Sequence, residues 1–288
     1  MIYNFSEYVK YSLFNEKIDK AVILSDTEID TKNKLEKFDI KEPVGQILAL
    51  SKKYKYVFVV LDELNWDNIF RLYKNFPKNV CILNLNAGYT WIWKKDILAD
   101  MDDIYINPLV KVLEPMDIEN LNFYVENFIK EPTLTHIRVP NKEIDYKIGW
   151  EELDLDYKEI IDFAEYGISG YSGLVISYWS TLAETLNAVW LLQSEWLGVD
   201  LFWVGNYKQD LSTELIKKID YQEKIFVVGD FDALIFRDLI YSKFFEFNLN
   251  KKIYFITPID LKLTLPEYLS EQVKMQWIDI YNRIKDKI

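Results

Sequence analysis

Short runs of β-branched, aliphatic and aromatic residues recur along the chain, and stretches with helical periodicity separate them. KAVILS at residues 20–25 and YVFVVL at residues 56–61 are examples of these apolar runs. Strands of a parallel sheet are buried on both faces, so they read as continuous apolar segments, and each needs a helix-length crossover before the next. The alternation therefore predicts an α/β fold in which mostly parallel sheets carry helices on both faces.

The same patterns assign the individual elements. The expected strands span residues 20–25, 56–61, 79–83, 109–113, 134–139, 174–178, 199–204, 224–228 and 252–256. The expected helices span residues 5–14, 42–51, 66–74, 118–129, 182–196, 211–218, 231–245 and 269–284. Residues 141–170 are rich in charge and contain no compact apolar run. We therefore expect two domains, 1–145 and 171–288, joined by a linker over residues 146–170.

Composition excludes several classes of protein. The chain has 288 residues and a formal net charge of −12, whereas a general nucleic-acid binder or a ligand of acidic membranes needs a basic face. No run of about 18 apolar residues occurs, so no membrane-spanning helix is expected. The N-terminus lacks the pattern of a secretory signal, and a single cysteine cannot form an intramolecular disulfide. These features favour a cytoplasmic protein.

Common motifs of cofactor and metal sites are absent. The chain has no G-x-x-x-x-G-K-[ST] phosphate loop, and its segment GISGYSG at residues 167–173 precedes a strand instead of following one. Cys81 and His136, the single cysteine and histidine, lie inside apolar runs, where a structural role is the common one. Acidic clusters at residues 100–103 and 151–156 lack the glycine-turned loop of a calcium site, so they indicate solvated surface and no metal site is expected.

Several segments, taken in chain order, carry a family resemblance. KFDIKEPVGQILAL is similar to a segment in which a glutamate follows a short strand and starts a helix. NPLVKVLEPMDIENL is similar to the pattern PxxxVxxPxDxxE, EPTLTHIRVP to GPxYIRLPR, and SGLVISYWSTLAETLNAVWLL to DVTIVAYGSMVxxALEAAxxL. Together they resemble the C-terminal half of transketolase-like, thiamine-diphosphate-dependent enzymes, which is also the layout of the β subunit of 2-oxoacid dehydrogenases. The resemblance implies a pyrimidine-binding domain followed by a transketolase C-terminal domain.

The resemblance also implies a site. Glu42 takes the position of the family glutamate, whose carboxylate hydrogen-bonds a ring nitrogen of the aminopyrimidine and promotes its imino form. An acidic residue in this place is also what the helix dipole favours, so a plain helix-start role stays open. Leu61 or Leu64 takes the place of the aromatic residue that stacks on the pyrimidine. The positions that the resemblance places near the substrate are Arg138, His136 and Asp100.

The chain lacks some of the family's motifs, and another subunit would have to supply them. It has no G-D-G…N motif, so it lacks the family's grip on the diphosphate and its Mg²⁺. The resemblance therefore implies a β-type subunit that completes a thiamine diphosphate site with a diphosphate-binding α-type partner, and self-association as a dimer. The stretch TWIWKKDILADMDD also lacks the family's histidine. The alternative is a catalytically silent relative that acts as a structural or regulatory partner.

Overall fold

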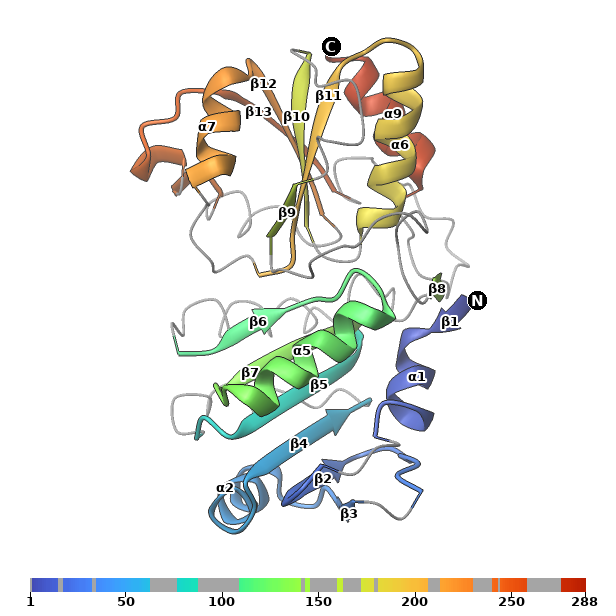
Figure 1. Ribbon diagram of the computed structural model, residues 1–288, viewed down its shortest axis with the longest axis vertical. Coiled ribbons are helices and arrows are strands. Elements are labelled where there is room, and N and C mark those ends of the chain that lie inside the picture. Colours follow the sequence, from blue (N-terminus) through green and yellow to red (C-terminus); the bar gives the residue numbers. More distant parts are fainter. Residues whose placement is uncertain are drawn as a thin grey trace, which may run out of the picture. The chain divides into compact units, whose positions relative to one another are not determined.

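A computed structural model describes residues 2–14, 18–32, 35–62, 77–87, 109–140, 143–145, 160–162, 172–178, 181–206, 213–229, 240–242, 244–257 and 276–288. These residues form two compact units, each with its own large β-sheet (Figure 1). Described residues up to 145 belong to the first unit, and those from 160 onward belong to the second.

A parallel sheet of six strands forms the first unit, in the order β3-β2-β4-β5-β7-β6. The strands are Ala21–Ser25 (β2), Glu36–Asp39 (β3), Tyr56–Leu61 (β4), Val80–Ala87 (β5), Lys111–Leu113 (β6) and Thr135–Pro140 (β7). All neighbouring pairs are parallel, so the carboxyl ends of the strands lie along one edge of the sheet. The interior strand β4 is buried along its whole length, whereas the edge strand β3 is exposed at every residue.

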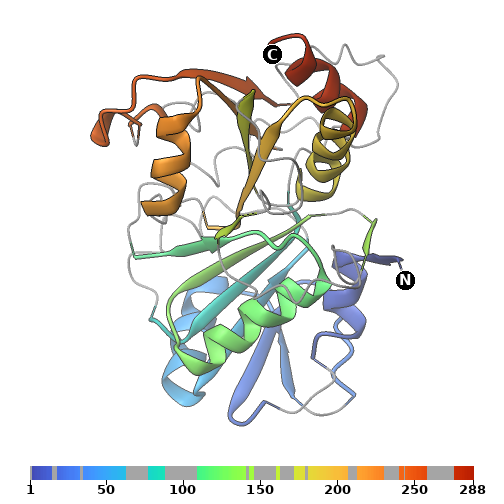
Figure 2. The same ribbon diagram turned by 45° about the horizontal axis from the view of Figure 1, so that its top comes forward.

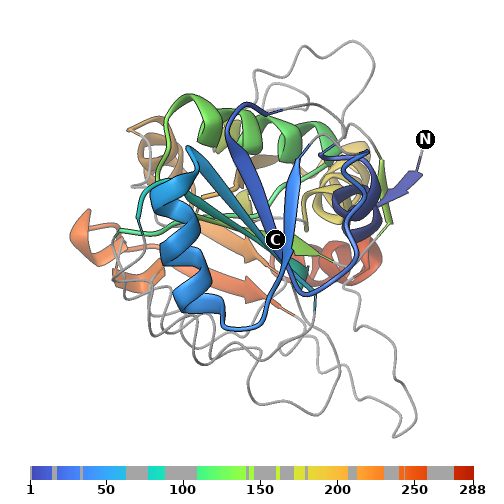
Figure 3. The ribbon, with the colours of Figure 1, turned by 90° about the horizontal axis from the view of Figure 1, so that it is seen from below.

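Helices cover both faces of this sheet (Figure 3). The helices α1 (Phe5–Tyr11) and α5 (Ile118–Lys130) lie on one face, and α2 (Pro43–Lys53) lies on the other. Phe58 of β4 points toward the first of these faces. The rings of Phe14 and Phe128 pack edge-on against it, with centroids 5.2 and 5.4 Å from the Phe58 centroid. This aromatic cluster ties α5 and the segment after α1 to the centre of the sheet.

The first unit also contains a small antiparallel pair, β1 (Ile2–Asn4) with β8 (Glu143–Asp145). Asn4 then caps α1, because its Oδ1 accepts a hydrogen bond from the Glu7 N–H at 3.1 Å. Asp117 caps α5 in the same way, accepting from the Asn120 N–H at 2.7 Å. Both side chains satisfy backbone donors that a helix leaves open at its start.

A sheet of five strands forms the second unit, in the order β13-β12-β10-β11-β9. The strands are Ile160–Asp162 (β9), Gly173–Tyr178 (β10), Val199–Val204 (β11), Lys224–Val228 (β12) and Lys252–Ile256 (β13). β9 pairs antiparallel with β11 at one edge, and the other neighbours are parallel. Gly173 lies against the Phe226 ring: a Cβ at this position would be 2.9 Å from the ring.

Helices also cover both faces of the second sheet. The helices α6 (Leu182–Ser194) and α9 (Trp277–Lys285) lie together on one face, and α7 (Thr213–Tyr221) lies on the other (Figures 1 and 2). A hydrogen-bonded group joins α9 to the end of α6. Glu195 accepts from the Tyr281 hydroxyl and from the Lys285 ammonium, each at 2.7 Å.

The α/β class, the parallel sheets and the helices on both faces, all expected from the sequence, are confirmed. The strands β4, β11, β12 and β13 have the expected bounds. β9 lies within the range expected to be a linker, because a three-residue edge strand has too few residues to show a periodicity. The helix expected over residues 66–74 lies outside the described residues.

Candidate functional site

The strand order of the first unit marks one position at the carboxyl edge of its sheet. From β2 the chain moves outward to β3, and it then returns to β4 on the opposite side of β2. In open α/β sheets, ligands bind outside the carboxyl ends of strands where the strand order reverses in this way. The residues that follow β2 and β4 are therefore the candidate ligand site.

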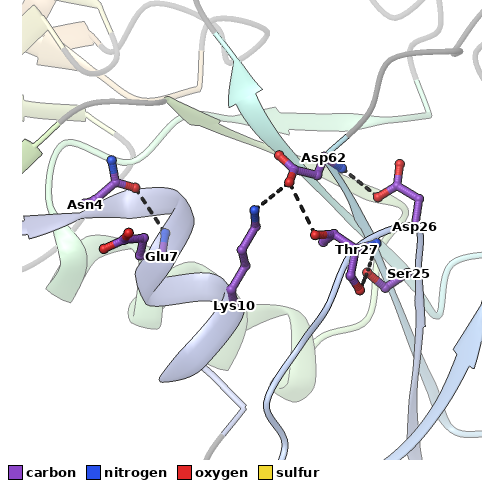
Figure 4. A network of polar contacts seen from close by, with 7 residues as sticks. All are labelled: Asn4, Glu7, Lys10, Ser25, Asp26, Thr27 and Asp62. Carbon is purple, nitrogen blue, oxygen red and sulfur yellow. Dashed lines mark hydrogen bonds and ion pairs between the residues drawn. The ribbon is translucent and has the colours of Figure 1, made fainter.

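A polar network occupies this position (Figure 4). Asp62 follows β4, and its carboxylate accepts hydrogen bonds from Lys10 of α1 at 2.5 Å and from the Thr27 hydroxyl at 3.3 Å. The Asp62 N–H donates to the carboxylate of Asp26, which follows β2, at 2.7 Å. The Lys10 and Asp62 side chains are 21% and 19% exposed, so this ion pair is partly shielded from water. The network ties α1 to the ends of both strands, and Lys10 neutralises the Asp62 carboxylate.

A pocket of about 360 Å³ lies beside this network, at the ends of β2 and β3. Its lining residues are Ser25, Asp26, Thr27, Glu28, Lys37, Asp39 and Ile40. Three carboxylates face a single ammonium group, so the pocket favours a neutral or cationic ligand over an anion. The hydroxyl of Ser25 is used internally, because it donates to the Thr27 carbonyl at 2.9 Å and accepts from the Thr27 N–H at 3.1 Å.

Glu42 directly precedes α2, two residues after the last residue that lines this pocket. It is the N-cap of the helix, Pro43 follows it, and its side chain is exposed. The carboxylate forms no capping hydrogen bond. It lies over the first helical turn, since a Cβ at Gly45 would be 3.7 Å from Glu42 Oε2. A carboxylate held at a helix N-terminus and not used for capping can accept a hydrogen bond from another molecule.

The structure describes one of the two leucines expected to contact a pyrimidine ring. Leu61 is the last residue of β4 and is 2% exposed, so its side chain presents almost no open face. Leu64 lies outside the described residues, and so does Asp100, one of the residues expected near the substrate.

His136 and Arg138, also expected near the substrate, are both buried in β7. His136 is 0% exposed and Arg138 is 3% exposed. They point to the same face of the sheet because they are two residues apart in a strand. The Arg138 guanidinium lies 3.1 Å from the carboxylate of Glu114, which follows β6.

The first unit does not bring Arg138 close to Glu42. Glu42 follows the edge strand β3, and β7 lies four positions away in the order β3-β2-β4-β5-β7-β6. At about 4.8 Å between neighbouring strands, the two strands are roughly 19 Å apart. One small group cannot contact both side chains from within this unit.

Sequence reasoning did not single out Lys10, Asp26 or Asp62. The signal was present for the two aspartates, because each directly follows an apolar run, AVILS or YVFVVL. A polar residue just after a buried parallel strand lies at the carboxyl edge, where ligands bind. Lys10 lies on a separate helix, and its approach to Asp62 depends on how α1 packs.

The described residues hold no group of three or more His, Cys, Asp or Glu side chains that could bind a metal ion. Of the residues expected to contact thiamine diphosphate, Glu42 is exposed, Leu61 is buried and Leu64 lies outside the described residues. Within the described part of the chain, no helix has the length and hydropathy needed to cross a membrane.

No protein-family model and no curated protein sequence matches the chain. Several solved structures match it. A "split gene transketolase, inactive beta4 tetramer" matches with a TM-score of 0.73 and 14% identity, over 93% of this chain and 92% of that chain.

Longer transketolases match as well. A transketolase mutant from Pichia stipitis gives a TM-score of 0.67 at 11% identity, and the transketolase from Campylobacter jejuni gives 0.67 at 7% identity. These matches cover 100% and 94% of this chain but only 46% and 44% of the longer proteins, so the chain spans less than half their length. The chain has the fold of the C-terminal half of a transketolase.

Proposed function

We propose that this chain is the β-type subunit of a split thiamine-diphosphate-dependent enzyme, of the transketolase or 2-oxoacid dehydrogenase type. The observation that supports the proposal is the match to a split-gene transketolase chain over 93% of this chain and 92% of that one, because the two chains then share a fold over nearly their whole lengths. A partner subunit of α type would supply the diphosphate-binding half.

Under this proposal, each residue expected at the site has a role. When bound, thiamine diphosphate supplies a thiazolium carbon that can form and stabilise a carbanion. Glu42 would hydrogen-bond a ring nitrogen of the aminopyrimidine and hold a proton at that atom, which its exposed carboxylate is free to do. Leu61 or Leu64 would provide apolar contact to the ring. Mg²⁺ and the diphosphate would be held by the partner.

The assembly is part of the proposal. The neighbour with the matching length is described as an inactive β4 tetramer. By analogy, this chain alone would self-associate, at least as a dimer, and would have no turnover. Activity would require the α-type partner, and a cytoplasmic location suits such a pair.

A second candidate is a catalytically silent relative that serves as a structural or regulatory partner. Two observations favour it. Leu61 is 2% exposed, which leaves little surface for a ring. Arg138 is engaged by Glu114 instead of standing open to a substrate. These observations concern substrate and ring contacts, and they leave Glu42 accessible.

The test is affinity purification of the tagged chain from its own cells, followed by mass spectrometry of bound proteins and cofactors. We expect a stoichiometric partner that carries G-D-G…N, together with thiamine diphosphate and Mg²⁺. Recovery of the chain without such a partner and cofactor would favour the silent relative.

Within the purified complex, Glu42→Gln separates the two candidates further. The substitution keeps the size of the side chain and removes its charge, so assembly should persist while turnover is lost. Glu126→Gln is the matched control, because Glu126 is also an exposed glutamate of the first unit, paired with Lys130 one helical turn away. Full activity of the Glu42→Gln complex would refute the assigned role.

A further inference from the structure

The side chain of Gln46, one turn into α2, is bonded to the turn that carries Glu42. Its Oε1 accepts the Lys41 N–H at 2.7 Å and the Glu42 N–H at 2.9 Å. Its Nε2 donates to the Asp39 carbonyl at 3.0 Å. Three of the four hydrogen bonds that a primary amide can form are thus spent on residues 39–42. The partners, two N–H groups and one carbonyl, also fix which way the amide points.

This arrangement differs from the other helix starts that the structure describes in the first unit. In α1 and α5 the N-cap side chains, Asn4 and Asp117, bond backbone N–H groups of their own helices. In α2 the N-cap side chain does no capping. Gln46 instead reaches back and holds the backbone of the N-cap residue. The Glu42 carboxylate itself does not make the capping bond that an N-cap side chain usually makes.

Two neighbouring residues, Pro43 and Gly45, also affect the Glu42 carboxylate. Pro43 is the first residue of α2, so its ring fixes the backbone there and no N–H is present to compete for the carboxylate. Gly45 leaves space above the first turn, where Glu42 Oε2 lies 3.7 Å from the position of a Cβ. The carboxylate can thus rest near the positive end of the helix dipole without being bonded to it.

We propose that Gln46 is the positioning residue of Glu42, and that it holds the turn at residues 39–42 so that the Glu42 carboxylate is presented to the aminopyrimidine of thiamine diphosphate. This rests on the proposed function. Gln46 acts through Glu42 and does not touch the ligand. Binding to a turn that is already held requires less ordering than binding to a loose one.

The hydrogen bonds from Gln46 to residues 39–42 are called the clamp below. Amide hydrogen exchange in the full chain tests whether the clamp forms, without any ligand. In the wild type, the Lys41 and Glu42 amides should exchange slowly. Gln46→Ala should speed both by about tenfold, the factor expected for the loss of one ordinary hydrogen bond. Gln46→Glu keeps an acceptor oxygen for the two amides but loses the donor to the Asp39 carbonyl, so it should preserve part of the protection. Lys52→Ala, an exposed site at the other end of α2, is the control and should leave both amides unchanged.

Thiamine diphosphate binding to the complex with the α-type partner tests the functional part. Gln46→Ala should raise the Kd for thiamine diphosphate by about tenfold, as is common when a group that orients a ligating residue is removed. In a Glu42→Gln background the same substitution should change the Kd little, because its effect passes through the Glu42 carboxylate. Gln46→Glu, which keeps the acceptor for the two amides, should give a Kd between those of the wild type and Gln46→Ala.

The outcomes separate the inference from the function on which it rests. Fast exchange of both amides in the wild type, or no response to Gln46→Ala, would overturn the clamp. If Gln46→Ala cost the same affinity in the wild type and in the Glu42→Gln background, Gln46 would act on the fold and not through Glu42, and the positioning role would be overturned. A wild-type complex that binds no thiamine diphosphate would refute both the proposed function and the positioning role, while the exchange data would still decide whether the clamp exists.

Discussion

The guanidinium of Arg138 lies 3.1 Å from the carboxylate of Glu114, and the two side chains are only 4% and 1% exposed. The pair joins the carboxyl ends of β6 and β7, which are neighbours in the sheet. A substrate group that bound Arg138 would first have to displace a carboxylate from a buried site. Arg138 can therefore bind a substrate only after its pairing with Glu114 is broken, and the sequence did not predict this pairing.

Removal of one partner from this pair should destabilise the chain strongly. Glu114→Gln takes away the negative charge and leaves the Arg138 guanidinium buried, for which a loss of about 3–5 kcal/mol in the free energy of unfolding is typical. Urea denaturation followed by circular dichroism measures the change. Glu126→Gln, in an ion pair whose side chains are 64% and 67% exposed, should change stability by about 0.5 kcal/mol or less. Similar values for the two variants would show that the buried pair does not form.

Two glycines should respond to alanine with opposite signs. Gly173→Ala would place a Cβ 2.9 Å from the Phe226 ring and 3.3 Å from the Lys224 carbonyl, so we expect a loss of about 1–3 kcal/mol from overpacking. Gly45→Ala would meet only Glu42, at 3.7 Å, and should raise stability by about 0.5–1 kcal/mol through helix propensity. Thermal melts compare the two. Phe226→Leu should relieve part of the Gly173→Ala loss, and no relief would contradict this cause.

Trp196 adopts a left-handed backbone conformation, with φ of 64°. Its side chain is 84% exposed, so little packing is lost on its removal. Trp196→Gly should therefore stabilise the chain by about 1 kcal/mol, because glycine has no Cβ to strain in this region. Trp190, 60% exposed inside α6, is the control. Trp190→Gly should destabilise by about 1 kcal/mol, and the same sign for both in urea titrations would contradict the backbone explanation.

Burial raises the pKa of the Cys81 thiol well above its usual range. The native thiol should stay protonated and resist iodoacetamide, whereas the unfolded thiol ionises above about pH 8.5. Because the native pKa is the higher one, stability is complete below that pH and falls as pH rises, by about 1.4 kcal/mol at one pH unit above the unfolded pKa. Cys81→Ala should remove this part of the pH dependence between neutral and mildly alkaline pH. Alkylation of Cys81 in the folded chain, measured by mass spectrometry, would contradict its burial.

The sequence predicted best those elements whose burial is uniform. β4 and β12 read as continuous apolar runs because both faces of an interior strand are covered, and their bounds matched. The order of strands could not be derived, because it depends on which edge each crossover reaches. β9 escaped for a different reason: it lies in a charged stretch and pairs with β11 along only three residues.

The candidate site was likewise predicted only in part. The family resemblance placed Glu42 at a helix start, and the structure has it at the N-cap of α2. The contact of Lys10 with Asp62 joins residues 52 positions apart and depends on the packing of α1. The clamp by Gln46 is local, yet a glutamine four residues into a helix is too common in sequences to signal it.

The position of β7 has a consequence for folding of the chain during its synthesis on the ribosome. β7 (Thr135–Pro140) is the last strand of the six to be made, but it pairs with β5 on one side and β6 on the other. Until residue 140 has emerged, β5 has an open edge and β6 has no neighbour to join. Such an edge is a template for pairing with another chain. Nascent chains stalled before β7 should therefore aggregate. The first sheet can be completed only once residues 135–140 have been translated.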